Sequence, residues 1–393
     1  QEGLYGASVN ATGSFLPRSI QASCERMMDI NELLHEVVAR KASDLHLRVP
    51  SPPMLRINGA LMPMSKYPNC GADDLRHVFE QITNEGERER FYADLELDLA
   101  YSVAGLARFR VNVSQQRGTL SLAFRHVAYT IPTIDELGLP PVCKALALRR
   151  KGLIIVTGPT GTGKSTTLAA MIGHLNQNSS RNVICIEDPI EFLHRNDKCL
   201  ISQRELGDDT RSFATALKHC LRQDPDVILV GEMRDLDTIT TAITAAETGH
   251  LVLTTLHTNT AAQTVDRIID VFPQGQQGQV RMQVAVVLEA VLAQTLVPKA
   301  DGSGRVAAFE VMIGSDSIRN LIRENKVYQI PTYIHTGTQQ QMQTMEQSLH
   351  RLLAAGVITR EAAMAHSNSP EELLILLGDA KRKLREPALR RAQ

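Results

Sequence analysis

A glycine-rich loop in the middle of this 393-residue chain constrains the fold more than any other part of the sequence. Its residues match the pattern G-x-x-x-x-G-K-[ST], with the apolar run 152–157 before it and a helical stretch from residue 165 after it. Such a loop closes backbone N–H groups around phosphates, and the helix N-terminus adds its positive dipole. A glycine-rich turn with a chance lysine is the alternative, and the flanking strand and helix argue against it. We therefore expect a nucleotide to be bound by Gly158, Pro159, Thr160, Gly161, Thr162, Gly163, Lys164, Ser165 and Thr166.

Two residues of the loop have defined tasks in such a site. Lys164 is expected to reach the β- and γ-phosphates of a nucleoside triphosphate, and the Ser165 hydroxyl to ligate Mg²⁺. A nearby buried strand should then supply an acidic group close to the metal. The run Val227–Val230 is entirely apolar and Glu232 follows it. Because no Asp stands at this strand end, Glu232 is expected to hold the metal through a water molecule.

Strands and helices alternate from residue 134 onward. Apolar, β-branched runs typical of buried parallel strands occupy residues 152–157, 183–187, 227–230 and 251–256. Helical stretches between them cover residues 165–176, 211–221 and 236–248. This alternation predicts an α/β fold with a doubly wound parallel sheet. The later run 284–297, which contains Glu289 and Gln294, is predicted to be a packed helix in a mostly helical C-terminal region.

The chain before residue 134 has a different pattern. Residues 28–39 have helical spacing, and short strand-like runs then follow between turns rich in Pro and Gly. These features predict a small α+β domain. The expected organisation is a flexible extension at 1–27, the α+β domain at 28–133, an ATPase domain at 134–340, and a helical region with a basic tail at 341–393.

Further polar residues at strand ends are candidates for catalysis. Glu187 and Glu191 follow the strand at 183–187, at the strand end where ligands bind in open α/β sheets, and one of them could activate a water molecule. A turn-forming acidic run is the alternative. His250 and His257 flank the strand at 251–256, where they could report on the γ-phosphate, although paired histidines are more often structural.

Three arginines of the N-terminal domain are candidates for contacting the γ-phosphate. Phosphoryl transfer gains much from an arginine at that position, often one from another subunit. Arg108 and Arg110 alternate along one strand, and Arg125 lies on a nearby strand. Exposed arginines on such strands are usually only solvated.

Bulk properties exclude several classes of protein. The formal net charge is −1, which does not indicate nucleic acid as the main partner. No apolar run reaches the roughly 18–20 residues of a membrane span, and residues 1–27 lack the apolar stretch of a secretory signal. The six cysteines form no C-x-x-C pair, so zinc-knuckle spacing is absent. Taken together, these features predict a cytoplasmic protein.

In combination the motifs resemble those of the type IV pilus retraction ATPases, a branch of the secretion ATPase superfamily. The resemblance rests on the phosphate loop, the acidic cluster at 187–191, the segments LVGEMRD and AETGHLVLTTLHT, and the sequences KASDLHL and SIRNLIRE. It implies a PAS-like N-terminal domain, a RecA-like ATPase domain and a homohexameric ring that binds ATP and Mg²⁺ between the domains. It also implies that Glu191 polarises the attacking water, that Glu232 is the Walker B carboxylate, and that His250 and His257 form a histidine box. The best matches to the interfacial arginines of the family are Arg108, Arg110 and Arg125.

By the same resemblance the motor would act at the cytoplasmic face of the inner membrane, through a pilus platform protein. In the helix at 318–324, Ile318, Leu321 and Ile322 are expected to face inward and Arg319 and Arg323 outward. An ATPase of a type IV or type II secretion system or of pilus assembly is the alternative. A regulatory paralogue that binds nucleotide without hydrolysing it is a further one, and the intact Lys164, Glu191 and Glu232 argue against it.

Overall fold

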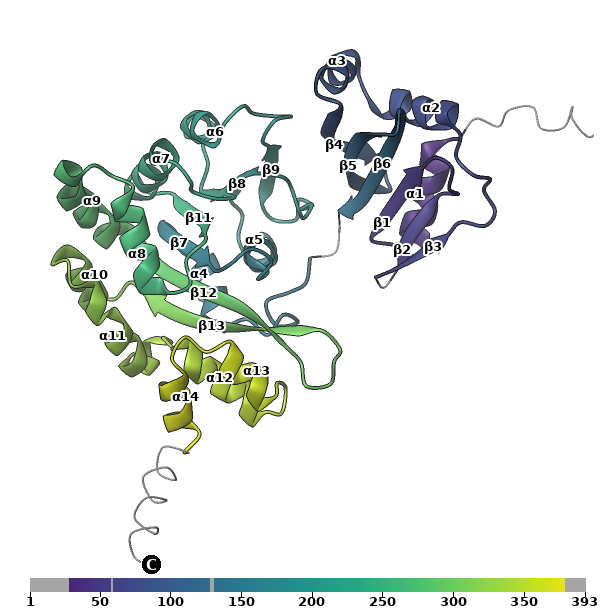
Figure 1. Cartoon of the computed structure of the whole chain (residues 1–393). Coiled ribbons are helices and arrows are strands. Elements are labelled where there is room, and N and C mark those ends of the chain that lie inside the picture. Colours follow the sequence, from purple (N-terminus) through teal and green to yellow (C-terminus); the bar gives the residue numbers. More distant parts are fainter. Residues whose placement is uncertain (1–27, 58, 128–130, 379–393) are drawn as a thin grey trace, which may run out of the picture. The chain divides into compact units, whose positions relative to one another are not determined.

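Two compact units make up this computed structural model, which describes residues 28–57, 59–127 and 131–378 (Figure 1). The division falls after Val127, so residues 1–127 form one unit and residues 128–393 the other. The predicted extension at 1–27 and the basic tail from residue 379 lie outside the described residues. None of the described helices combines the length and the apolar character that a membrane span needs.

The first unit is an antiparallel sheet of six strands in the order β3-β2-β1-β6-β5-β4. Its strands are β1 (Asp44–Arg48), β2 (Met54–Ile57), β3 (Ala60–Pro63), β4 (Glu96–Val103), β5 (Ala107–Gln116) and β6 (Thr119–Val127). Its helices are α1 (Ile30–Ala39), α2 (Ala72–Ile82) and α3 (Glu85–Asp94). This arrangement confirms the predicted α+β class, and α1 agrees with the helical spacing at 28–39.

Alternation along the strands gives this sheet one apolar and one polar face. In β5 the side chains of Ala107, Phe109, Val111 and Val113 are buried, whereas the alternating Arg108 and Arg110 are partly exposed. Successive side chains of a strand point to opposite faces, so all the arginines at even positions of β5 share one face. Helix α1 contributes Ile30, Leu33, Leu34 and Val37 to the core, all fully buried.

The second unit is built on a seven-stranded sheet in the order β13-β12-β7-β11-β10-β8-β9. The strands are β7 (Gly152–Thr157), β8 (Asn182–Glu187), β9 (Leu200–Glu205), β10 (Val227–Val230), β11 (Leu251–Leu256), β12 (Leu288–Pro298) and β13 (Arg305–Ile313). All neighbouring pairs are parallel except β12 with β13. The predicted doubly wound parallel sheet is thereby confirmed.

Helices cover both faces of this sheet (Figure 1). Alternate residues of β7 belong to two different cores: Leu153 and Ile155 to one, Ile154 and Val156 to the other. The core that contains Ile154 includes residues of α4 (Val142–Ala147) and α5 (Lys164–Asn178). The core that contains Leu153 includes residues of α6 (Phe213–Cys220), α7 (Leu236–Glu247), α8 (Ala261–Asp270), α9 (Gln274–Val287), α10 (Asp316–Arg323) and α11 (Ile330–Thr336).

The remaining helices pack at the hairpin formed by β12 and β13. A separate core joins Val297 and Ala308 of these strands to α12 (Met345–Ala354), α13 (Arg360–Ala365) and α14 (Pro370–Leu376). Two short 3-10 helices, η1 (Val327–Gln329) and η2 (Thr338–Gln340), precede and follow α11. Helix α14 begins at a capping Ser369, whose hydroxyl accepts a hydrogen bond from the Glu372 N–H, because the first turn of a helix leaves N–H groups without partners.

The prediction of a packed helix at 284–297 is wrong for most of that run. Helix α9 ends at Val287, and Leu288–Pro298 is the strand β12, which pairs with β7 and β13. Most of β12 is buried because its alternate residues belong to the two cores on opposite faces of the sheet. A strand buried on both faces loses the polar–apolar alternation that identifies strands in a sequence, and its Ala and Leu residues favour helix.

Helix α10 differs in one detail from the expectation. Ile318, Leu321 and Ile322 are buried and Arg323 is exposed, as predicted. Arg319 instead turns back onto the protein, where its guanidinium pairs with Glu289 at 2.8 Å and donates to the Gly314 carbonyl at 2.7 Å. The prediction that Arg319 faces outward is therefore wrong, because the half-buried carboxylate of Glu289 on β12 lies within reach of its guanidinium.

Candidate functional site

Four strands of the second unit end at one pocket of about 510 Å³. The segments that follow β7, β8, β10 and β11 all contribute lining residues, because parallel neighbours bring their carboxyl ends to the same edge of the sheet. The structure thereby brings together most of the residues predicted from the sequence. Those in the pocket lining are Thr160, Gly161, Gly163, Lys164, Ser165, Thr166, Glu187, Glu191, Glu232 and His257.

The loop after β7 has the backbone geometry of a phosphate cradle. Gly158, Gly161 and Gly163 adopt φ values of 144°, 79° and 86°, a region that residues with a Cβ rarely enter. A Cβ on Gly158 would lie 2.3 Å from the carbonyl oxygen of Gln294, so this position also has no room for one. Gly163 is the N-cap of α5, and the first residues of that helix, Lys164, Ser165 and Thr166, line the pocket.

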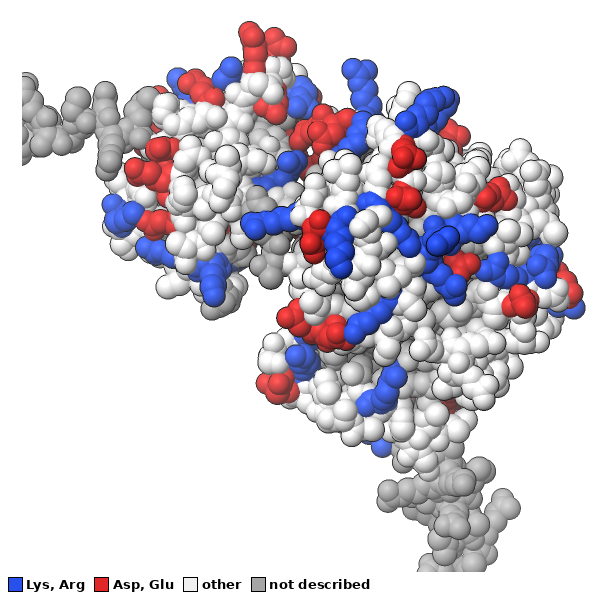
Figure 2. All heavy atoms as spheres, turned by 180° about the vertical axis from the view of Figure 1, so that it is seen from behind, with Lys and Arg blue, Asp and Glu red and all other residues white. Residues whose placement is uncertain are grey.

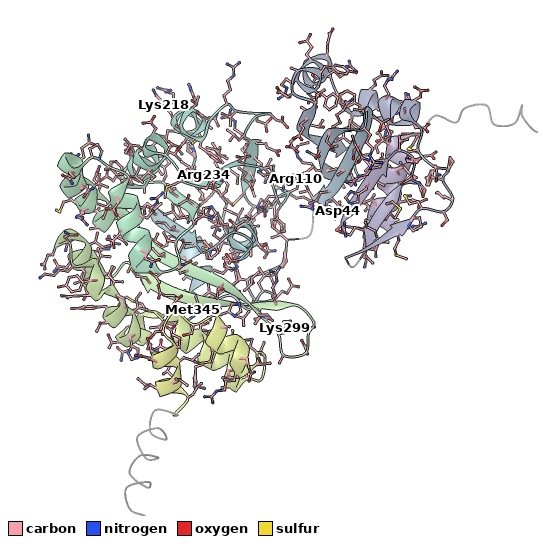
Figure 3. The ribbon with its side chains drawn as sticks, in the orientation of Figure 1. Asp44, Arg110, Lys218, Arg234, Lys299 and Met345 are labelled. Carbon is pink, nitrogen blue, oxygen red and sulfur yellow. The ribbon has the colours of Figure 1, made fainter. Side chains whose placement is uncertain are left out.

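A chain of polar contacts crosses the floor of the pocket. Lys164 Nζ lies 3.4 Å from His257 Nδ1, and His257 Nε2 lies 3.3 Å from Glu232 Oε2. The other carboxylate oxygen of Glu232 pairs with Arg234 Nε at 2.6 Å. Glu232 is buried and Arg234 is largely exposed, beside the sheet in Figure 3. Both carboxylate oxygens of Glu232 are thus engaged by neighbouring side chains.

The side chain of Lys164 is held in place by carbonyl groups of the same loop. Its ammonium donates to the carbonyls of Gly158 at 2.8 Å and Pro159 at 3.1 Å. Burial lowers the pKa of Lys164, and the carboxylates of Glu232 and Glu191 oppose that decrease. The acidic residues of the pocket therefore help to keep the lysine charged.

The two carboxyl groups after β8 differ in environment. Glu187 accepts a hydrogen bond from Gln203 Nε2 at 2.9 Å, whereas Glu191 is exposed in the pocket. Burial raises the pKa of Glu187 to about 7, with the Gln203 hydrogen bond opposing this rise and the charge of Glu191 adding to it. Near neutral pH Glu187 is therefore partly protonated and is not a fixed negative charge.

Strand β9 shapes the segment that carries Glu191. Gln203 also donates to the Phe192 carbonyl at 2.8 Å and accepts from the His194 N–H at 2.9 Å. Glu205, two residues further along β9, accepts from the Ile190 N–H at 3.3 Å. Three backbone groups around Glu191 are thus fixed by side chains from a neighbouring strand.

His250 is not brought into the pocket. It immediately precedes β11, whereas His257 immediately follows it, and six strand residues span roughly 20 Å. The Nδ1 atom of His250 lies 2.9 Å from the Ala245 carbonyl and 3.2 Å from the Thr248 hydroxyl, both near the end of α7. In this structure His250 thus links α7 to the start of β11, at the end of the strand away from the pocket.

The three predicted arginines lie on the polar face of the first unit. Arg110 of β5 stands opposite Arg125 of β6, and Arg125 stands opposite Asp44 of β1. Arg125 Nε donates to Asp44 at 2.9 Å, and Arg108 lies 3.5 Å from the Ser102 hydroxyl. Burial raises the pKa of Asp44, but its contacts with Arg125 and Ser43 outweigh burial and lower it overall. Asp44 and Arg110 are labelled in Figure 3.

Several pocket residues escaped the sequence reasoning. They are Phe192, His194, Phe213, Arg234, Leu296 and Arg305. For Arg234 a signal existed: the apolar Met233 stands between Glu232 and Arg234, so these two residues could have been expected to point the same way. Leu296 lies in the run 284–297 that was predicted to be helical, and Arg305 begins β13, a strand that the sequence analysis did not predict.

Charged residues outside the pocket form no large surface of one sign on the face shown in Figure 2. Lys and Arg side chains are interspersed there with Asp and Glu. This mixture agrees with the formal net charge of −1.

Comparison with known proteins identifies relatives along most of the chain. A family model described as Type II/IV secretion system protein matches residues 21–365. The type IV pilus retractation ATPase PilT of Pseudomonas aeruginosa is 47% identical over 344 residues, which cover 88% of this chain and 99% of that protein. A twitching motility protein of Neisseria gonorrhoeae is 46% identical over 321 residues, covering 82% of this chain and 86% of that protein.

A solved structure has the same fold. The crystal structure of the pilus retraction motor PilT with bound ADP matches with a TM-score of 0.82 at 46% identity. The match covers 88% of this chain and 99% of that one. The similarity therefore extends through both compact units.

Proposed function

This chain belongs to the type II/IV secretion system protein family, as a P-loop ATPase of the pilus-retraction type, and we propose that it is a ring-forming motor whose ATP hydrolysis drives retraction of a type IV pilus. One observation carries the proposal: a pilus retraction ATPase is nearly half identical to this chain along 99% of its own length. A shared fold alone would not indicate a shared task, but the pocket also contains the residues that phosphoryl transfer needs.

The residues present fit ATP and Mg²⁺. The glycine loop and the N-terminus of α5 offer N–H groups to the phosphates, with the Lys164 ammonium beside them. The Ser165 hydroxyl and a water molecule held by Glu232 would ligate Mg²⁺, which neutralises charge on the β- and γ-phosphates. Because both oxygens of Glu232 already contact Arg234 and His257, a role through water suits it better than direct ligation.

Glu191 is the group best placed to orient and polarise the attacking water. It is exposed in the pocket, on a segment fixed by Gln203 and Glu205. Glu187 also lines the pocket and has a pKa of about 7, so its partial protonation limits the negative charge on this side of the pocket. His257 contacts both Lys164 and Glu232, and through them its position depends on the bound phosphate.

Arg108, Arg110 and Arg125 complete the site when chains assemble into a hexameric ring, in which they reach the γ-phosphate. Their common position on the polar sheet face supports this role. Alanine at Arg110 or Arg125 should lower kcat at least about tenfold, because an arginine on the γ-phosphate stabilises the charge of the transition state. Arg76→Ala, at an exposed arginine of α2, is the control and should leave kcat unchanged.

A phosphate-release assay measures kcat, and light scattering measures the number of chains in the assembly. Scattering should give the mass of six chains in the presence of nucleotide, for the parent and for all three variants. A protein that stays monomeric at every nucleotide concentration, or arginine variants that turn over at the parent rate, would contradict this proposal.

In the cell the motor acts in the cytoplasm, at the inner membrane, on a platform protein of the pilus. The decisive experiment deletes the gene in its host and restores it as the parent or as Lys164→Ala. We expect the deletion to give surplus pili and no twitching, because assembly continues while retraction stops. Electron microscopy counts the pili, and colony expansion measures motility.

Other phenotypes of the same deletion would indicate a different function. Cells without pili would assign the chain to pilus assembly. Normal pili together with failed protein export would assign it to a secretion system. Restoration of twitching by Lys164→Ala would show that ATP hydrolysis at this pocket is not needed for movement.

A further inference from the structure

Strand β12 runs directly behind the phosphate loop. Its Ala293 pairs with Thr157, the last residue of β7, and β12 then continues to Pro298 beside the loop that leaves β7. The backbones approach so closely that a Cβ on Gly158 would clash with the carbonyl oxygen of Gln294 at 2.3 Å. The loop therefore rests against this strand.

The side chain of Gln294 makes two hydrogen bonds with the loop and its helix. Its Nε2 donates to the Thr162 carbonyl at 2.7 Å, and its Oε1 accepts from the Thr167 hydroxyl at 2.7 Å. Gln294 is only 4% exposed and Thr167 only 1%, so solvent does not compete for either bond. The orientation of the amide is fixed, because a carbonyl oxygen can only accept and Thr162 must therefore face the NH₂ end.

We propose that Gln294 is a positioning residue for the nucleotide, which sets the direction of the loop N–H groups without touching the ligand. The carbonyl of Thr162 and the N–H of Gly163 belong to one planar trans peptide, in which they point in opposite directions. When Gln294 draws that carbonyl towards β12, the Gly163 N–H turns to the opposite side, and Gly163 lines the pocket. The bond to Thr167 ties the same amide to the first turns of α5.

The amide cannot be replaced by its acid. A glutamate at residue 294 would accept where Thr162 needs a donor, and would add a negative charge behind the phosphates. A methionine would keep the length and apolar bulk of the side chain while removing both hydrogen bonds. Without its donor the buried Thr162 carbonyl turns to another partner, and restoring the peptide for the phosphates should weaken nucleotide binding by about 10- to 100-fold.

The experiment measures the Kd for ADP with Mg²⁺, and the KM and kcat for ATP, in full-length chains. We expect Gln294→Met to raise Kd and KM by about 10- to 100-fold with a smaller change in kcat, because the loop holds the substrate phosphates before and during the reaction. Gln294→Glu should raise Kd further. Thermal unfolding without nucleotide shows whether each variant is folded.

Thr167 provides a second, independent set of variants. Thr167→Val removes the hydroxyl at constant shape and should raise Kd, whereas Thr167→Ser keeps the hydroxyl and should restore the parent value. The double variant Gln294→Met with Thr167→Val should bind no more weakly than the weaker single variant, because both changes break one network. If Gln294→Met does not fold, the Thr167 pair decides.

Gln343→Met is the matched control. The amide of Gln343 donates to the Phe309 carbonyl of β13 at 2.9 Å, so the control loses a hydrogen bond of the same kind in the same sheet. It should leave Kd and KM unchanged. Gln294→Met with Kd and KM within twofold of the parent, even with a lower melting temperature, would overturn the proposal, as would fully additive effects in the double variant.

The inference rests on nucleotide binding at this loop, which is one part of the proposed function. A deletion strain without a retraction phenotype would contradict pilus retraction and leave the binding result standing. Failure of the parent chain to bind ADP would overturn both.

Discussion

Replacing Lys164 with alanine is expected to lower kcat for ATP hydrolysis by at least about a hundredfold. The ammonium of Lys164 is the cation that the loop carbonyls of Gly158 and Pro159 hold in place at the pocket. Its loss removes positive charge from the site where negative charge develops on the γ-phosphate, and no other lysine lines this pocket among the described residues. Phosphate release at saturating ATP measures the effect, and an ADP titration measures the accompanying loss of affinity.

Lys218→Ala is the control for this variant. Lys218 is an exposed lysine in the last turn of α6, labelled in Figure 3, and its removal changes the net charge by the same amount. Its kcat should match that of the parent. If Lys164→Ala released phosphate at more than half the parent rate, the assignment of the loop to the catalytic site would be wrong.

Replacing Glu232 with glutamine is expected to separate binding from turnover. The amide keeps the size of the side chain but loses the charge that attracts Arg234 and His257, and that would hold a metal-bound water. We expect kcat to fall by about a hundredfold or more while the Kd for ADP changes little, because the phosphates are bound mainly by the loop. Parallel measurements of phosphate release and ADP binding test both halves of this expectation.

Glu247→Gln provides the matched control. Glu247 is an exposed glutamate at the end of α7, where its carboxylate accepts from Gln283 Nε2 at 2.9 Å. This variant should hydrolyse ATP at the parent rate. If Glu232→Gln hydrolysed ATP normally, or lost ADP binding to the same extent as turnover, the assignment of Glu232 to the hydrolytic step would be wrong.

The sequence predicts the strands of the ATPase unit that stand alone better than the strand that directly follows a helix. The runs at 152–157, 227–230 and 251–256 coincide with β7, β10 and β11, because parallel strands covered on both faces are continuously apolar. The same property misled the assignment of β12, whose apolar run is joined to the end of α9 without a turn. Length and periodicity cannot separate a helix from a buried strand when one follows the other directly.

In the candidate site, the residues within a motif were predictable, but the residues that hydrogen-bond to the motif segments and hold them in place were not. Lys164, Glu187, Glu191, Glu232 and His257 stand in local patterns, and the structure brings them to one pocket. Gln294 lies on a strand 132 positions after the carbonyl that it holds, Gln203 lies on β9, 11 positions after Phe192, and no local pattern marks either residue. Their contribution depends on the order of strands in the sheet, which a single sequence does not contain.

The position of β7 in the sheet has a consequence for the order in which the protein can form during synthesis. The neighbours of β7 are β11 and β12, both made long after it, and Gln294 follows Thr162 by 132 positions. The first unit can complete its sheet as soon as Val127 has left the ribosome. When β7 emerges, by contrast, both of its edges remain unpaired until β11 and β12 have been made. ATP therefore cannot help the nascent chain to fold through a finished phosphate loop until β12 has emerged, and a chain interrupted before residue 288 leaves the ribosome with an exposed, aggregation-prone strand.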